Sequence, residues 1–298
     1  MTILALTLVL VAAVLHPTWN LLAKRATDGD QIAFIWLTSA LSAVLYVPFV
    51  ITLWAITPAR LHEVRVDLAM MLGTGILHLI YFLLLQRSYR GGEFSLVYPV
   101  ARGTGPLVTA LAAVALFGER LAPLQCAGVA SIVVAIFIIA GGHMNPLSAH
   151  SATPTLRRSL GYGITTGLAI ASYTVWDKQA VSALAISPIL YDFGRTAVQT
   201  LLLAPAVLSS REKRNVLWTT WRQFRPEAFG VAILSPLAYV LVLYALTTAP
   251  VSLVAPVRES SIVIGAFMGA HFLREGQLRR RIIAASLMLG GIVALARC

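Results

Sequence analysis

The chain has 298 residues, of which 58% are hydrophobic and only 12% are charged, and its formal net charge is +11. A soluble domain has about 25% charged residues, and a water-soluble chain of this length has too little interior to bury so much apolar surface. The composition therefore excludes an ordinary soluble domain and indicates that lipid is the solvent. The basic residues gather in short gaps between apolar runs, a pattern typical of membrane loops rather than of a nucleic-acid-binding face.

Ten apolar segments are long enough to cross about 30 Å of hydrocarbon, which takes about 20 helical residues. In chain order the predicted spans cover residues 2–23, 31–54, 66–88, 93–116, 122–141, 160–180, 188–209, 227–247, 251–273 and 279–297. The longest polar stretch follows the fifth span. We therefore expect a first five-helix unit at 1–142, a linker at 143–159 and a second five-helix unit at 160–298.

The fourth and ninth spans contain nearly the same six residues. Residues 95–100 read SLVYPV and residues 252–257 read SLVAPV, so five of six positions are identical at an offset of 157. The same offset aligns Trp19 with Trp176. Because each unit has an odd number of spans, the second unit would enter the membrane with the opposite orientation to the first. Inverted repeats of this kind build secondary transporters, with the substrate site near the midplane between them.

Two features of the loops bear on how the chain sits in a membrane. Lysines and arginines concentrate in the gaps after the odd-numbered spans, and the positive-inside rule then puts both termini outside the cytoplasm. One of these gaps, residues 209–225, carries five basic residues with Trp218 and Trp221 among them. This composition predicts an amphipathic segment that lies on lipid headgroups.

Charged residues within the repeated spans are the first candidate site residues. Arg102 lies about nine residues into its span, or about 14 Å deep, and the repeat offset aligns it with Glu259, which follows Arg258. A charge at this depth costs at least about 2.5 kcal/mol unless it is paired or hydrated. Two interpretations remain open: a salt bridge that holds the halves together, or two poles that bind the carboxylate and the ammonium of a zwitterion. A gate pair that breaks during transport satisfies both.

Prolines at matching depth predict helix breaks in the same two spans. Pro99 and Pro106 lie in the fourth span and Pro256 in the ninth. A proline removes a backbone donor and frees a carbonyl oxygen, so both helices should kink. Kinks that serve packing alone are the alternative, but paired placement in both halves favours a cavity-lining role.

Aromatic and polar side chains at spacings of three or four residues predict a cavity wall. Tyrosine, tryptophan and histidine combine an apolar body with a polar tip, which suits a hydrated apolar cavity. For any one of them core packing is the alternative. The candidate cavity residues are Trp19, Asn20, His78, Tyr81, Tyr98, Trp176 and Tyr239.

Other charged and aromatic residues are assigned structural roles. We expect Asp177 to form a surface pair with Lys178 near the end of a span, and Arg195 to pair with Asp192 three residues earlier. Tyr46 is expected to belong to the aromatic belt at the membrane surface. The chain contains no G-x-x-x-x-G-K-[ST] phosphate loop and no H-E-x-x-H motif. We therefore predict no enzyme, no bound cofactor and no metal site.

Three local sequences resemble the drug/metabolite transporter superfamily, and more narrowly its EamA-type members. They are Trp19-Asn20 at the end of the first span, the segment 95–99, and the turn Gly118-Glu119-Arg120-Leu121 after the fourth span. The second copy of this turn, at 274–278, is degenerate. The resemblance covers nearly the whole chain, and it implies a basket of ten helices around a central cavity that works by alternating access.

Within that family the chain is similar to the YddG-type exporters of aromatic amino acids. It departs from them because Tyr98 directly precedes Pro99, whereas those proteins place the tyrosine two or three residues before the proline. They also have both termini in the cytoplasm, against the charge distribution of this chain. These departures concern the substrate and the orientation and leave the expected fold unchanged.

The sequence thus predicts an all-α integral membrane protein with ten transmembrane helices in two inverted-topology five-helix repeats around a central cavity. We expect a secondary transporter of the bacterial inner membrane, functional as a monomer, that exports small amphipathic metabolites and above all aromatic or hydrophobic amino acids. Its partners are the small-molecule substrate and the lipid bilayer, without nucleic acid. An exporter of organic cations with the same fold and a non-transporting membrane receptor or scaffold are the alternatives. Proton exchange and facilitated diffusion both remain open as energy sources.

Overall fold

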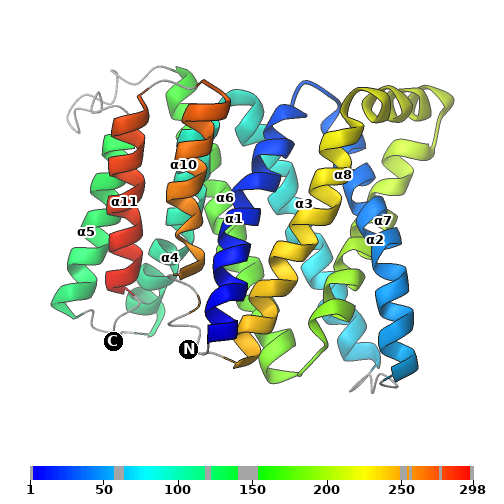
Figure 1. Ribbon diagram of the computed structural model, residues 1–298, viewed down its shortest axis with the longest axis horizontal. Coiled ribbons are helices and arrows are strands. Elements are labelled where there is room, and N and C mark those ends of the chain that lie inside the picture. The colour runs from blue at the N-terminus through cyan, green and yellow to red at the C-terminus, as the bar shows by residue number, and fades with distance from the viewer. Residues whose placement is uncertain are drawn as a thin grey trace.

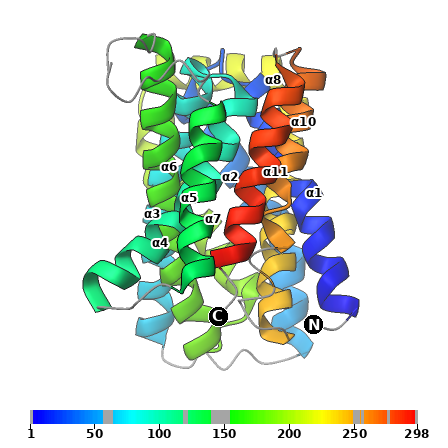
Figure 2. The ribbon, with the colours of Figure 1, turned by 90° about the vertical axis from the view of Figure 1, so that its left-hand side faces the viewer.

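The protein is a bundle of helices that run side by side in more than one layer, seen in a computed structural model (Figures 1 and 2). The model describes residues 3–56, 64–117, 122–139, 154–248, 254, 257–274 and 277–295, and every regular element in these ranges is helical. The first half contains α1 (Ile3–Arg25), α2 (Gln31–Ile56), α3 (Val64–Gly91), α4 (Phe94–Phe117) and α5 (Pro123–Ile139). The second half contains α6 (Pro154–Lys178), the π-helical turn η1 (Gln179–Ala183), α7 (Pro188–Leu208), α8 (Arg211–Thr248), α10 (Ser261–Phe272) and α11 (Leu278–Leu295). Figure 1 shows that α1 begins and α11 ends at the same end of the bundle.

Several helices have the length and composition of membrane spans. Among the described residues, Ile3–Arg25, Gln31–Leu53, Arg65–Arg90 and Arg211–Ala245 are long and apolar enough to cross a bilayer. The helical stretches Pro123–Ile136 and Ser261–Phe272 are apolar but shorter. These helices support a multi-pass membrane protein. The number of ten spans stays a prediction, as does the division at 143–159, most of which lies outside the described residues.

The two halves of the chain pack mainly against each other. α1 lies along α8 and α3 lies along α6, while α2 packs on α7 and α5 packs on α11 (Figures 1 and 2). In addition, α4 contacts α6 and α10 contacts α1. The largest apolar cluster accordingly draws side chains from both halves. The core of the protein lies where the halves meet, so a site between them is surrounded by helices.

Helix α8 consists of two segments that meet at a kink. Phe224 has non-helical backbone angles (φ −122°, ψ 23°) and is followed two residues later by Pro226. The segment before the kink lies across the end of the bundle, and the segment after it runs down through the bundle (Figure 1). The guanidinium of Arg222 lies 5.1 Å from the ring centre of Trp218 on the transverse segment. This placement agrees with the predicted headgroup-lying segment at 209–225.

The two proline-containing spans differ in the structure. α4 is helical at every residue from Phe94 to Phe117, so no non-helical residue marks Pro99 or Pro106, and kinks at these prolines stay a prediction. A proline removes a single backbone hydrogen bond, and the bonds of the neighbouring turns hold the helix together. In the second half a turn at Glu259–Ser260 precedes α10, so the chain does break beside the charged pair. Pro256 itself lies outside the described residues.

Candidate functional site

A small closed chamber lies in the core between the two halves. Its volume is about 30 Å³, which has room for one or two water molecules but not for a metabolite. Six helices (α1, α3, α4, α6, α7 and α8) contribute to its wall. The lining residues are His16, Trp19, His78, Tyr81, Phe82, Arg102, Tyr173, Arg195, Ser235 and Tyr239.

Aromatic side chains form most of the chamber wall. The imidazole of His78 stacks on the ring of Tyr173, with ring centres 4.0 Å apart and planes 28° apart. Tyr81 meets Tyr173 edge-on at 5.4 Å, and Trp19 meets Phe82 at 5.6 Å. Such pairs bury large apolar area and leave polar tips available. The structure therefore brings Trp19, His78 and Tyr81 together around the chamber, and Tyr239 joins them.

Arg102 and Glu259 approach each other across the boundary between the halves. Arg102 Nη1 lies 3.6 Å from Glu259 Oε1, and both side chains are buried. Arg258 holds the same carboxylate oxygen more closely, by hydrogen bonds of 3.0 Å from Nε and 2.7 Å from Nη2. The other oxygen, Glu259 Oε2, is buried and has no hydrogen-bond partner among the described residues. The arrangement leaves Arg102 at a longer distance than a charge-assisted hydrogen bond, which is about 2.7–2.9 Å.

The aromatic ring of Tyr98 lies beside this ion pair. The guanidinium carbon of Arg102 is 5.7 Å from the ring centre of Tyr98. Tyr98 also stacks on Phe94 and packs against Gly265 of α10, where an added Cβ would come within 2.5 Å of the tyrosine ring. Tyr98 is thus fixed next to Arg102, one layer behind the chamber wall.

Asp177 is buried at the centre of a hydrogen-bond network, so its predicted surface pair with Lys178 is wrong. Its Oδ1 accepts hydrogen bonds of 2.7 Å from the hydroxyls of Thr74 and Tyr191, and its Oδ2 accepts one from Tyr239. His78 Nε2 lies 3.9 Å from Oδ2. The carboxylate faces inward because the π-helical turn η1 continues α6 beyond it, so the position lies deeper than the end of a helix. Irregular turns of this kind are frequent at functional sites.

A second buried polar network joins α2 and α7. Arg195 pairs with Asp192, as predicted, and its Nη1 donates a 3.1 Å hydrogen bond to Gln199 Oε1. The hydroxyl of Tyr46 donates a 2.6 Å hydrogen bond to Asp192 Oδ2. Tyr46 is therefore not a membrane-belt residue: its side chain points between helices to satisfy a buried carboxylate that would otherwise lack donors. Arg195 also lines the chamber, as Arg102 does.

Besides Tyr98, two predicted cavity residues do not line the chamber. Trp176 is 37% exposed, donates a 3.0 Å hydrogen bond to the carbonyl of Met70, and packs over Gly73. Successive helical residues point about 100° apart, so when Asp177 faces inward Trp176 faces outward. Asn20 is buried but behind the wall, where its side chain accepts a 2.7 Å hydrogen bond from the hydroxyl of Tyr89.

The sequence contained a signal for the most important missed residue. The repeat offset of 157 aligns Asp177 with Asn20, which was chosen as a candidate, so the pairing pointed to Asp177 as well. The same offset aligns Tyr173 with His16, and both residues line the chamber. No comparable signal marked Arg195, whose place at the chamber depends on how α7 is rotated in the bundle.

The described part of the chain is an all-helical bundle with apolar spans and a buried chamber of charged and aromatic side chains, which defines the class as multi-pass membrane proteins. Residues 157–297 match the EamA-like transporter family, which supports membership in the drug/metabolite transporter superfamily. A solved structure titled only "Crystal structure of protein" covers 98% of this chain and 98% of its own, with a TM-score of 0.61 and 14% identity. At that identity the likeness shows a common fold alone. A comparison with curated protein sequences gives no match.

Proposed function

We propose that the protein is a secondary transporter that exports small amphipathic metabolites by alternating access, with aromatic and hydrophobic amino acids as the first candidates. The observation that carries the proposal is the buried Arg102–Glu259 pair beside an aromatic chamber. Charges within membrane spans mark substrate or ion pathways. We place the protein in a bacterial inner membrane and expect one monomer to enclose the pathway.

An internal two-fold relation between the halves supports alternating access. If α1–α5 correspond to α6–α11, exchanging the halves turns the α1–α8 contact into the α6–α3 contact, and both contacts exist. The α10–α1 and α4–α6 contacts are related in the same way, while α2–α7 and α5–α11 each map onto themselves. This pattern is what inverted repeats produce, and two such halves can exchange conformations around a central site.

The charges in and beside the chamber suit a zwitterion with an apolar side chain. A substrate carboxylate would bind the guanidinium fork of Arg102, which holds Glu259 only at 3.6 Å. Its ammonium would be attracted by Glu259, whose Oε2 lacks a partner among the described residues. Tyr81 and Trp19 would contact the ring or aliphatic chain. In this role the pair acts as a gate: substrate replaces the contact that closes the chamber.

Because the chamber holds only about 30 Å³, substrate binding requires the halves to separate. The pair spans α4 and the turn before α10, so parting these elements would open the chamber on the Arg102 side. Another part of the chamber wall is Arg195, which is tied to Asp192 and through it to Tyr46. In this proposal the Arg102–Glu259 pair and the Arg195 network act as the two closures of different composition that alternating access needs.

A second candidate, the export of organic cations, is favoured by the surroundings of Asp177. This buried carboxylate lies among Tyr191, Tyr239 and the stacked ring of His78. A carboxylate with aromatic neighbours can bind a quaternary ammonium by charge and cation–π attraction.

Counterflow in proteoliposomes tests these functions. Labelled phenylalanine and a labelled quaternary amine are compared for the wild type, for Arg102→Ala, and for Arg211→Ala as an exposed control. We expect phenylalanine counterflow that falls at least about tenfold in Arg102→Ala, as for loss of one charge-assisted contact, and is unchanged in Arg211→Ala. Counterflow of the amine alone would favour the second candidate. No counterflow of either by folded protein would favour a receptor or scaffold.

A further inference from the structure

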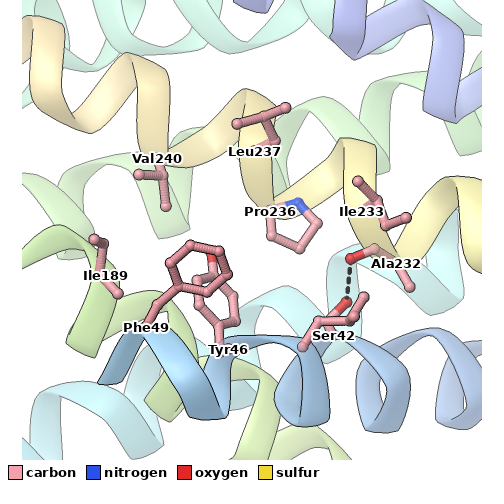
Figure 3. Close-up of a pocket in the computed structure, with 10 residues that line it drawn as sticks. Ser42, Tyr46, Phe49, Ile189, Ala232, Ile233, Pro236, Leu237 and Val240 are labelled. Atoms are coloured by element: carbon pink, nitrogen blue, oxygen red, sulfur yellow. Dashed lines mark hydrogen bonds between the residues drawn. The ribbon is translucent and has the colours of Figure 1, made fainter. Parts of the chain in front are cut away.

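A large apolar groove opens on the outer surface of the bundle between α2 and α8. Its volume is about 470 Å³, within the range of small-molecule sites. Figure 3 shows its wall: Tyr46 and Phe49 rise from α2, Ile233, Leu237 and Val240 descend from α8, and Ile189 of α7 closes one end. Phe49 is 61% exposed and Ile233 49%, so in a membrane the groove would face lipid.

The groove adjoins a smaller recess that lies between it and the chamber. The recess has a volume of about 10 Å³, close to the space of a single oxygen atom or water, and shares Ser42 and Pro236 with the groove. At its other end it shares Arg195 and Ser235 with the chamber. Three neighbouring spaces, separated by the side chains that they share, therefore lie in a row from the lipid face to the middle of the protein.

Gln199 supplies a polar group to this recess. Its side chain is fully buried, and its Oε1 accepts hydrogen bonds from Arg195 Nη1 (3.1 Å) and Ser39 Oγ (3.2 Å). These two donors fix which end of the amide is the oxygen. The opposite end, Nε2, has no hydrogen-bond partner among the described residues. A buried donor without a partner is costly, so the recess is complementary to an acceptor atom.

The polar groups of Tyr46, Arg195 and Ser42 have partners. The hydroxyl of Tyr46 donates to Asp192, and Asp192 neutralises Arg195. The hydroxyl of Ser42 lies 2.9 Å from the carbonyl oxygen of Ala232, the bond drawn in Figure 3, and 2.8 Å from that of Thr38. With its charges balanced and its remaining free group a donor, the site suits an uncharged ligand that offers a hydrogen-bond acceptor.

The depth of the groove narrows the choice of ligand. Ser42 lies about 11 residues into α2, or about 17 Å from its start, which is near the middle of a core about 30 Å thick. The ester carbonyls and headgroup of a phospholipid lie at the membrane surface, so only its acyl tail would reach this depth. Filling the recess requires an apolar molecule that carries its acceptor into the hydrocarbon.

We propose that the groove between α2 and α8 binds an uncharged, bilayer-dissolved aryl ketone or quinone, with its carbonyl oxygen in the recess at Gln199. Its ring lies on Tyr46 and Phe49, and its alkyl chain runs along Ile233 and Leu237. This site is separate from the chamber and independent of the proposed transport function. A carbonyl oxygen in the recess lies beside Arg195, which also lines the chamber.

Photolabelling of the full-length protein in nanodiscs tests the site. The probe is 4-decylbenzophenone, whose carbonyl is both the acceptor and the photoreactive group, and labelled peptides are mapped by mass spectrometry. We expect saturable labelling on peptides containing Phe49 and Ile233. A decyl-substituted benzoquinone should compete, and a decylbenzene without a carbonyl should compete at least about tenfold more weakly.

Three variants separate specific binding from partitioning into lipid. Gln199→Met keeps the volume but removes the donor and should weaken labelling about five- to tenfold, as expected for one hydrogen bond. Ile233→Trp fills the groove and should abolish labelling of these peptides. Leu201→Trp, at a position 72% exposed, is the matched control and should leave labelling unchanged. Gel filtration checks that each variant is folded.

The proposal is overturned by labelling that does not saturate, that spreads evenly over lipid-facing peptides, or that persists unchanged in folded Gln199→Met. Equal competition by decylbenzene would also overturn it, because the carbonyl would then be irrelevant. Loss of counterflow activity has no bearing on these readouts, so failure of the transport proposal and failure of this one are distinguishable.

Discussion

Removing Glu259 should destabilise the protein far more than removing Arg102, although the two form one salt bridge. Glu259 binds two cations, at 3.6 Å from Arg102 and 2.7 Å from Arg258. Glu259→Gln therefore leaves two arginines without their carboxylate, and one of them, Arg102, is 5% exposed. Arg102→Gln leaves Glu259 still paired with Arg258. The two losses of stability differ because Glu259 is the common partner of both arginines, whereas Arg102 is only one of the two partners of Glu259.

The expected magnitudes come from the geometry. At 3.6 Å and an effective dielectric constant of about 20, the attraction between Arg102 and Glu259 is about 4–5 kcal/mol before desolvation is subtracted. Leaving a buried charge without a partner costs about 3–5 kcal/mol, so Glu259→Gln should lower the free energy of unfolding by that amount. Arg102→Gln should lower it by about 1–2 kcal/mol, the net value of one charged contact.

Unfolding by sodium dodecyl sulfate in mixed micelles, followed by tryptophan fluorescence, measures both losses. The double variant Arg102→Gln/Glu259→Gln completes a cycle and should cost less than the sum of the two single changes, because the two groups interact. Equal losses for the two single variants, or a larger loss for Arg102→Gln, would show that Arg258 does not hold the carboxylate. Strict additivity in the cycle would show that the pair does not interact.

Three further variants test other contacts. Asp177→Ala should lower the free energy of unfolding by about 2–4 kcal/mol, because it removes the acceptor of three buried hydroxyls, whereas Tyr191→Phe should cost about 1 kcal/mol; equal losses in the same unfolding titration would contradict the network. Trp176→Phe should leave counterflow unchanged, because the side chain lies outside the chamber; a loss of transport with normal folding would place it in the pathway. Gly73→Ala should destabilise, because its Cβ would lie 2.3 Å from the Trp176 ring, and Gly161→Ala, with nothing within 4 Å, should be neutral or stabilising in thermal unfolding.

The helical class and the central ion pair could be predicted because both follow from the order of residues, through the length of the apolar segments and the internal repeat. Apolar length predicts membrane helices, and the repeat offset of 157 aligned Arg102 with Glu259, which the structure places 3.6 Å apart. Aromatic spacing placed His78 and Tyr81 correctly in the same wall.

The remaining site residues depend on how each helix is rotated about its axis, which composition does not determine. A chain that is apolar all round carries little periodicity to show which face points inward. Trp176 and Asp177 are neighbours in the sequence, so only one of them can face inward. The sequence favours Trp176 for the cavity and Asp177 for the surface, whereas in the structure Asp177 is buried and Trp176 is exposed. Tyr46 was assigned to the membrane surface for the same reason, since its partner Asp192 is 146 positions away in the chain.

Helix α8 contains a carbonyl oxygen that its own backbone cannot bond. Pro236 has no N–H to offer the oxygen of Ala232 four residues earlier, and Ser42 of α2 lies 2.9 Å from that oxygen. The serine hydroxyl has one hydrogen and a second acceptor, Thr38, at 2.8 Å. Rotation of the serine O–H about its C–O bond therefore switches its hydrogen bond from the carbonyl of Ala232 in α8 to that of Thr38 in α2. The serine hydroxyl keeps a hydrogen-bond acceptor when α2 and α8 move apart here. The contact between these two helices can therefore open without leaving the donor unpaired in the hydrocarbon.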